Sequence, residues 1–132
     1  MNKVLDYAQL LCEVLRTNYQ SYAIESHRNA IYAADAGDTW SVNYHKQQID
    51  KLCEGEGVYE FYIDTLRKYY KVVMKDENQS HSHCFIDKET GDVFKSASWK
   101  SPAKGVRFNL LDDNSREECY RRADWASSYL YK

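Results

Sequence analysis

Apolar residues in the N-terminal half of the chain recur with the spacing of an α-helix. The first run predicts an amphipathic helix that ends near Asn18. Its apolar face is formed by Val4, Leu5, Ala8, Leu11, Cys12 and Leu15. A second helical stretch is expected over about residues 21–36, where the following glycine stops it. A third is expected to use Asp38 or Thr39 as its N-cap and to run toward Cys53. The N-terminal half is therefore predicted to be mainly helical.

The hydrophobic period changes after the Gly-Glu-Gly sequence in the middle of the chain. Apolar residues alternate over positions 58–63, and residues 69–74 are rich in β-branched and aromatic side chains, so both segments are predicted to be strands. Two further strands, at about 83–87 and 93–95, flank a polar turn in which Gly91 suits a positive φ. The last three strands are expected to form a three-stranded antiparallel sheet.

The C-terminal segment carries the signals of a short helix. Asn114 or Ser115 can cap a helix that runs through Ala123, and the dense apolar residues after it predict a tail that docks. A chain of 132 residues has the length of a single domain. The sequence thus predicts an α+β fold. Its N-terminal helices, in residues 1–54, pack on a small antiparallel β-sheet, and residues 58–132 supply that sheet and a short C-terminal helix.

Composition narrows the class of protein. Tyrosine is in excess, with twelve copies, so aromatic rings are expected to build much of the core or of an interface. The four cysteines form no Cys-x-x-Cys pair, and the N-terminus lacks the pattern of a signal peptide. No apolar run approaches the roughly 20 residues of a membrane helix. We expect a reduced, soluble protein of the cytoplasm that is not attached to a membrane.

Catalytic sites receive little support from the residues. His81 and His83 alternate on a strand and offer two metal ligands, but no third ligand stands at a convincing spacing, so solvated histidines are favoured. Asp87, Glu89 and Asp92 crowd one turn, where acids are common for backbone reasons. Nucleophile-elbow, zinc-protease, Walker and dinucleotide-binding motifs are absent. We therefore expect a protein that is not an enzyme and that holds no metal or cofactor.

A basic and aromatic segment follows the predicted hairpin. From Phe94 to Leu111 the chain holds four cations and no acid, although its formal net charge is -2. The cations are Lys95, Lys100, Lys104 and Arg107, and the apolar faces are those of Phe94, Trp99 and Phe108. Charged donors beside aromatic faces are what a protein needs to hold a phosphate next to a base. The alternative is a solvated loop in which Trp99 and Phe108 anchor the core.

The run from Phe85 to Asn109 contains a Thr-Gly-Asp turn, a Lys-Ser-Ala-Ser-Trp-Lys-Ser-Pro-Ala-Lys block and a Val-Arg-Phe-Asn-Leu ending. Together with the Asp-Trp-Ala-Ser-Ser-Tyr-Leu-Tyr tail, it resembles a family of small proteins encoded by bacteriophages, including cyanophages. More distantly, it is similar to phage Thoeris anti-defence sponges. That resemblance implies an oligomer that sequesters cyclic ADP-ribose-type signals without cleaving them. It also implies that Phe85 stacks on the ligand and that Arg107 with Asn109 reaches phosphate or ribose.

The first functional hypothesis is a non-enzymatic phage protein in the host cytoplasm that captures a cyclic nucleotide-type signal. In this hypothesis Lys95, Lys104 and Arg107 neutralise phosphate, while Phe85 or Trp99 stacks on the base. A second hypothesis is a nucleic-acid-binding protein that uses the same surface, and a third is an inhibitor of a host enzyme. Sequestration needs a Kd near nanomolar, about -12 kcal/mol, which one exposed loop does not supply. A homo-oligomer is therefore expected, with the site walled by a second protomer or by the N-terminal helices.

Overall fold

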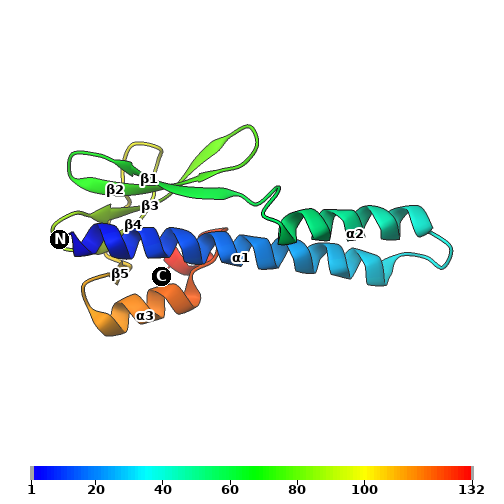
Figure 1. Ribbon diagram of the computed structural model, residues 1–132. Coiled ribbons are helices and arrows are strands. Elements are labelled where there is room, and N and C mark those ends of the chain that lie inside the picture. Colours follow the sequence, from blue (N-terminus) through cyan, green and yellow to red (C-terminus); the bar gives the residue numbers. More distant parts are fainter. Residues whose placement is uncertain (1, 132) are drawn as a thin grey trace.

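The computed structural model describes residues 2–131 and has an α+β architecture. Two N-terminal helices are followed by a five-stranded antiparallel sheet and a short C-terminal helix (Figure 1). The elements are α1 (Lys3–Ala33), α2 (Thr39–Cys53), β1 (Glu60–Thr65), β2 (Tyr69–Lys75), β3 (Ser80–Asp87), β4 (Asp92–Lys95), β5 (Phe108–Asn109), α3 (Asp113–Arg122) and the 3-10 helix η1 (Ser128–Leu130). The predicted fold class is confirmed.

Helix α1 is one continuous helix of 31 residues, so the prediction of two separate helices in this region is wrong. Asn18 and Ser21 are mediocre helix formers, but neither interrupts the backbone hydrogen bonds as glycine or proline would. The side chain of Asn18 instead accepts a hydrogen bond from the backbone N–H of Trp125 (3.0 Å), which ties the helix to the C-terminal tail. Among residues 2–131 no helix, α1 included, is both long and apolar enough to cross a membrane.

The third predicted helix is confirmed as α2, with Asp38 as its N-cap. The carboxylate of Asp38 accepts a hydrogen bond from the backbone N–H of Ser41 (3.1 Å), which satisfies one of the free donors at the helix start. Helix α3 begins slightly before the predicted caps, with Asp112 at the cap position. Ser115 lies inside this helix, and its hydroxyl accepts a hydrogen bond from the backbone N–H of Asn109 (2.8 Å).

The sheet has the strand order β1-β2-β3-β4-β5, and every neighbouring pair is antiparallel. The three strands predicted to form a sheet are its centre. The strand predicted over 58–63 joins them as the edge strand β1, and β5 forms the opposite edge. Sequence periodicity missed β5 because it contains two residues, Phe108 and Asn109, and two residues show no alternation.

The main core lies between one face of the sheet and the helices α1 and α3 (Figure 1). Helix α1 contributes one apolar stripe, and β2, β3 and β4 contribute the residues that point toward it. Its fully buried members include Ala8, Leu11, Leu15, Val72, Cys84, Ile86, Val93, Leu110, Cys119 and Leu130. The C-terminal tail, expected to dock, closes this core through Tyr129 and Leu130.

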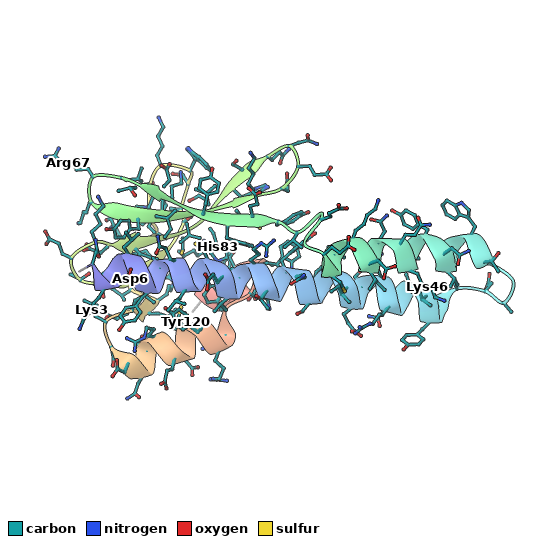
Figure 2. The ribbon with its side chains drawn as sticks, in the orientation of Figure 1. Lys3, Asp6, Lys46, Arg67, His83 and Tyr120 are labelled. Atoms are coloured by element: carbon teal, nitrogen blue, oxygen red, sulfur yellow. The ribbon has the colours of Figure 1, made fainter. Side chains whose placement is uncertain are left out.

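His83 is buried in this core, so the prediction of a solvated side chain is wrong for this residue. The β2–β3 register shifts between Val72 and Val73, and His83 is the extra residue of the resulting bulge. Its side chain lies between the sheet and α1 (Figure 2), with Nε2 2.7 Å from the hydroxyl of Tyr129. His81 stays exposed and lies 3.3 Å from the carboxylate of Asp76.

The second half of α1 and all of α2 project from the body as an antiparallel helical pair (Figure 1). We call residues 20–53 the arm. At its base the amide of Gln20 donates a hydrogen bond to the carbonyl of Leu52 (2.6 Å). Further out, Nδ1 of His27 and Nδ1 of His45 are 2.8 Å apart, which joins the two helices. The two helices of the arm therefore pack mainly on each other and lie outside the main core.

Candidate functional site

The face of the sheet that is turned away from α1 carries the candidate site. We call it the outer face. Strand alternation places Tyr69, Lys71, Phe85 and Phe94 on it, opposite the core residues that neighbour them in sequence. Both helices that cover the sheet lie on its other side (Figure 1). The outer face is covered instead by the loop between β4 and β5, residues 96–107, which we call the flap.

Lys71 is the centre of this face. Its side chain is only 3% exposed, although lysine is rarely buried. The ammonium nitrogen lies 3.2 Å from the centre of the Trp99 ring and 5.8 Å from that of Phe85. Lys71 takes part in none of the ion pairs that the structure shows among residues 2–131. The positive charge is therefore stabilised mainly by two aromatic rings, of which the one closer to it comes from the flap.

The electrostatics of Lys71 follow from this position. Burial lowers the pKa of Lys71 below its ordinary value, because the charged form is separated from water. The carboxylate of Asp64, its cross-strand partner on β1, opposes the effect and raises the same pKa. The result is an ammonium group with hydrogen-bond donors available and no carboxylate in direct contact. Such a group favours an incoming anion.

Aromatic side chains surround this cation. The ring of Tyr69 lies edge-on to Phe85 and to Phe94, with centroids 5.6 and 6.2 Å apart. Trp99 is 46% exposed, so one of its faces remains accessible while the other contacts Lys71. A partly accessible indole beside a desolvated ammonium can stack on a heterocyclic base while the ammonium contacts a phosphate.

The flap is held to the sheet at its base and is loosely held at its tip. At the base, the backbone N–H of Ala103 donates to the carbonyl of Lys95 (2.7 Å), and Ser96 pairs with Pro102. Near the tip, the hydrogen bonds are short-range ones within the flap, such as that between the hydroxyls of Ser98 and Ser101 (2.9 Å). The contact of Trp99 with Lys71 therefore joins the tip of the flap to the sheet.

Two of the six predicted site residues, Phe85 and Trp99, lie on this outer face. Phe85 is fully buried beneath Lys71 and Tyr69, so in this conformation it offers no free surface for stacking. The indole of Trp99 does offer one. Of the two rings predicted to stack on a base, the geometry favours Trp99.

The predicted cations Lys95, Lys104 and Arg107 lie elsewhere. The ammonium of Lys95 lies 4.5 Å from the ring centre of Tyr131, on the core side of β4. Arg107 donates to three backbone carbonyls, those of Leu130 (2.6 Å), Lys104 (3.0 Å) and Gly105 (2.7 Å). Arg107 therefore anchors the C-terminal tail through its bond to Leu130.

The side chain of Lys104 is exposed, and its backbone carbonyl accepts one of the hydrogen bonds from Arg107. The three predicted cations therefore do not converge on Trp99.

Asn109 is occupied by the turn between β3 and β4. Its amide nitrogen donates to the carbonyl of Thr90 (2.9 Å) and to the carboxylate of Asp92 (2.7 Å). Its oxygen accepts from the backbone N–H groups of Leu111 (2.8 Å) and Asp112 (3.0 Å). These bonds account for the whole hydrogen-bonding capacity of the amide, so the role of Asn109 here is structural.

Comparison with known proteins places the chain in a family. DUF7717, described as a family of unknown function, matches it over residues 1–132. The chain belongs to the DUF7717 family. No curated protein and no solved structure matches it.

In this DUF7717 chain, sequence reasoning missed Lys71, although the sequence contains a signal for it. The run Tyr69–Met74 has the composition of a strand buried on both faces, and a lysine in its middle interrupts that pattern. A charged residue at such a position is rarely tolerated unless it has a partner or a function. The missing information was the position of Trp99, because no sequence pattern shows that the flap folds back over β2.

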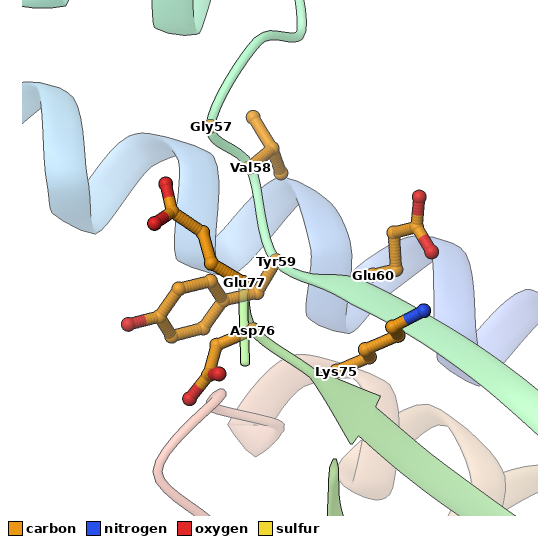
Figure 3. A pocket seen from close by; sticks show the side chains of 7 residues that line it. All are labelled: Gly57, Val58, Tyr59, Glu60, Lys75, Asp76 and Glu77. Carbon is orange, nitrogen blue, oxygen red and sulfur yellow. The ribbon is translucent and has the colours of Figure 1, made fainter. Parts of the chain in front are cut away.

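A separate cleft of the DUF7717 chain lies at the other end of β2, near the base of the arm (Figure 3). It has a volume of about 300 Å³ and contains the side chains of Tyr59, Glu60, Lys75, Asp76 and Glu77. Figure 3 shows the carboxylates of Asp76 and Glu77 beside the ring of Tyr59. Hydrogen bonds from the backbone N–H groups of the following turn lower the pKa of Asp76, so its carboxylate is ionised at neutral pH. This acidic cleft disfavours phosphate, in contrast to the outer face.

Proposed function

We propose that this protein binds a small phosphorylated, nucleotide-like molecule on the outer face of its sheet and does not cleave it. The supporting observation is the buried ammonium of Lys71, held 3.2 Å from the indole of Trp99 without an ion pair among residues 2–131. A phosphate oxygen gives this ammonium a better partner than a ring does. Trp99, released from the ammonium, then stacks on the base.

Energetics set the affinity of such a site. A charged hydrogen bond contributes about 1.5–3 kcal/mol, and stacking of a base on a ring contributes about 1–3 kcal/mol. One ammonium and the one accessible ring, Trp99, therefore give about 2.5–6 kcal/mol, which corresponds to a Kd between about 10 millimolar and tens of micromolar. Nanomolar capture requires further contacts. We propose that a second copy of the chain, or cations such as Lys100 next to Trp99 in the flap, supplies them.

The resemblance to phage anti-defence sponges indicates which ligands to test first. It supports cyclic ADP-ribose-type signals, and with them a role in the cytoplasm of a phage-infected host. These molecules combine a purine with a diphosphate, the two groups for which Trp99 and Lys71 are suited. Sequestration needs no catalytic group, which agrees with the absence of known catalytic motifs from the sequence.

A single-stranded nucleic acid is the second candidate, and one observation favours it. Tyr62, on the outer side of the edge strand β1, is 42% exposed and extends the aromatic surface away from Trp99. The net charge of -2 opposes tight binding of a long polyanion. The two ligands differ in salt response, because a strand that contacts many phosphates releases many counterions and a small ligand releases few.

Calorimetry with cyclic ADP-ribose isomers and with a single-stranded oligonucleotide tests the proposal. The wild-type protein is expected to bind the small ligand, and heat denaturation should release that ligand chemically intact. Lys71→Met keeps the length and apolar volume of the side chain and should weaken binding at least tenfold. Lys46→Met, which removes a lysine from the arm, is the matched control and should bind as the wild type does. Equal binding by both variants contradicts the assignment of the site, and a chemically altered ligand contradicts the absence of catalysis.

A further inference from the structure

Strand β1 forms one edge of the sheet, so only one of its two sides is paired (Figure 1). The backbone N–H of Leu66 donates a hydrogen bond to the carbonyl of Tyr69 (2.9 Å), which closes the β1–β2 hairpin with a hydrogen-bonded pair. Hydrogen-bonded and non-hydrogen-bonded pairs alternate along an antiparallel ladder. The register of the two strands therefore assigns the bonds to β2 to every second residue of β1, namely Glu60, Tyr62 and Asp64.

The other residues of β1 have free backbone groups. Phe61, Ile63 and Thr65 direct their N–H and C=O groups away from β2. In the described part of the chain, no helix, loop or further strand bonds to this side of β1. An unpaired strand edge is a template for one more strand. Extended peptides bind to such edges, because main-chain hydrogen bonds supply affinity and alternating side chains supply specificity.

A cleft of about 430 Å³ lies between β1 and α1. Its lining includes the apolar side chains of Cys12, Phe61 and Ile63, and α1 adds the polar side chains of Gln9, Glu13 and Arg16. In an added strand, the residues opposite Phe61 and Ile63 point to the same face of the sheet as these two do. Their side chains therefore enter the cleft, which suits small apolar residues such as valine.

The outer face of this edge is acidic. Glu60 and Asp64 are exposed there, and neither takes part in the ion pairs that the structure shows among residues 2–131. Their cross-strand partners on β2 are Lys75 and Lys71. An added strand with lysine or arginine opposite Glu60 and Asp64 places each acid between two cations. An added strand with acids at these positions is repelled.

A second copy of β1 fits this edge poorly. Antiparallel pairing about Tyr62 sets Glu60 opposite Asp64 of the other copy, and two-fold symmetry repeats this contact. Pairing about Ile63 sets the two Asp64 side chains on a diagonal, within about 8 Å of each other. Both registers bring acids together, and β1 carries no cation to offset them. The charges therefore favour a basic partner over self-association.

We propose that the edge of β1 docks an extended, basic segment of a partner protein, which joins the five-stranded sheet as a further, antiparallel strand. In this segment lysine or arginine alternates with small apolar residues. The cations face the two acids of β1, and the apolar side chains fill the cleft against α1. This inference does not rest on the proposed nucleotide site, because the added strand uses the backbone of β1 and not Lys71 or Trp99.

Hydrogen exchange followed by NMR tests the pairing residue by residue. The probe is a capped peptide of sequence Lys-Val-Lys-Val-Lys-Val-Lys. In the free protein the amides of Phe61, Ile63 and Thr65 are expected to exchange faster than those of Tyr62 and Asp64, which bond to β2. With a Kd of about 0.1 mM, peptide at about 1 mM is expected to slow the three fast amides about tenfold.

Two results of this experiment overturn the proposal. Exchange that stays unchanged with the peptide shows that the acids of β1 only guard a free edge. Slow exchange of the same three amides without peptide, at high protein concentration only, shows that a second copy occupies the edge.

Backbone N-methylation of the peptide separates strand addition from charge attraction alone. In the added strand the valines turn their N–H groups toward β1, while the N–H groups of the lysines point to solvent. Methylation of the valine nitrogens is therefore expected to weaken binding at least about tenfold, and methylation of the lysine nitrogens to change it less than about threefold. Equal binding of the two methylated peptides overturns strand addition. A Glu-Val peptide of the same length that binds as well as the Lys-Val peptide overturns the choice of a basic partner.

Variants of β1 provide the matched test on the protein. Thr65→Pro removes an outward N–H, where an edge strand tolerates proline, and is expected to weaken binding about fivefold, with Thr65→Ala as its control. Glu60→Gln combined with Asp64→Asn is expected to weaken binding about tenfold. Asp35→Asn combined with Glu54→Gln removes the same charge from exposed positions elsewhere and should bind as the wild type does. Circular dichroism confirms that each variant is folded. Folded β1 variants that bind the peptide as tightly as their controls overturn the proposal.

Discussion

The ammonium of Lys71 and the indole of Trp99 form the closest cation–π contact of residues 2–131, at 3.2 Å. Lys71 comes from the second strand of the sheet and Trp99 from the flap, so this pair joins the tip of the flap to the outer face. A buried cation costs desolvation free energy, and contact with a ring returns part of that cost. The contact is therefore not expected to add much to stability.

Lys71→Met is therefore expected to leave the free energy of unfolding within about 1 kcal/mol of wild type, because lost cation–π attraction and relieved desolvation largely cancel. Urea unfolding followed by circular dichroism measures this. The fluorescence of Trp99 should change in the folded state, since its closest charged neighbour is gone. A loss of more than about 3 kcal/mol would show that the cation itself is needed for the fold.

His83 gives the protein a defined acid sensitivity. Burial lowers the pKa of His83 from its ordinary value of 6.5 to about 4, an effect that the carboxylate of Asp124 only partly opposes. Between these two values the unfolded chain binds a proton that the folded chain does not, so stability falls as the pH is lowered from 6.5 to 4. The loss amounts to roughly 3 kcal/mol. Below this window, Asp76 and Asp87, whose pKa values are lowered by backbone hydrogen bonds, add a further loss.

The measurement is the free energy of unfolding at several pH values for the wild type, His83→Gln and His81→Gln. Glutamine at position 83 keeps a hydrogen-bonding group for the hydroxyl of Tyr129 and does not titrate. The slope between pH 6.5 and 4 is expected to disappear in His83→Gln and to persist in His81→Gln, whose side chain is exposed. The same slope in all three proteins would mean that other groups cause it.

Arg107 is expected to affect stability. Arg107→Gln removes a charged donor from three backbone carbonyls, including that of Leu130 in the C-terminal tail. We expect a loss of about 2–4 kcal/mol and faster proteolytic cleavage of the tail. Thermal unfolding and limited proteolysis measure both, with Lys104→Gln as the control on the same flap. An Arg107→Gln variant that melts as the wild type does, yet fails to bind ligand, would restore the phosphate-binding role predicted from the sequence.

Gly91 is expected to tolerate alanine less well than Gly37 does, although both have positive φ, 76° and 91°. A Cβ at Gly91 would lie 3.0 Å from Cγ of Leu111 and 3.2 Å from its backbone nitrogen, whereas a Cβ at Gly37 meets no atom within 4 Å. Gly37→Ala should cost about 1 kcal/mol from backbone strain alone, and Gly91→Ala about 2–4 kcal/mol because the backbone at Leu111, just after β5, must also move. Equal melting temperatures would contradict this difference.

Much of the fold follows from local sequence signals. Three of these signals act over only a few residues, and each predicted element is found at its signal. The capping side chain of Asp38 precedes α2, the alternation around Phe61 lies in β1, and the β-branched and aromatic residues at 69–74 form β2. The length of α1 does not follow, because Asn18 weakens a helix locally but is held in it by a hydrogen bond from Trp125 at the other end of the chain. The bulge that buries His83 is likewise a property of two strands together.

The candidate site shows the same division. The sequence by itself determined that a basic and aromatic segment follows the hairpin, because composition and turn residues are local properties. It left open whether Trp99 is exposed or anchors the core, and the structure shows it to be 46% exposed. Only the tertiary structure decided which cation Trp99 meets. In the structure, Arg107 and Asn109 donate hydrogen bonds to backbone carbonyls. The cation that contacts Trp99 on the outer face is Lys71, which comes from β2. Side-chain pairing across strands depends on register and on how a loop folds back, and neither is encoded within a single run of residues.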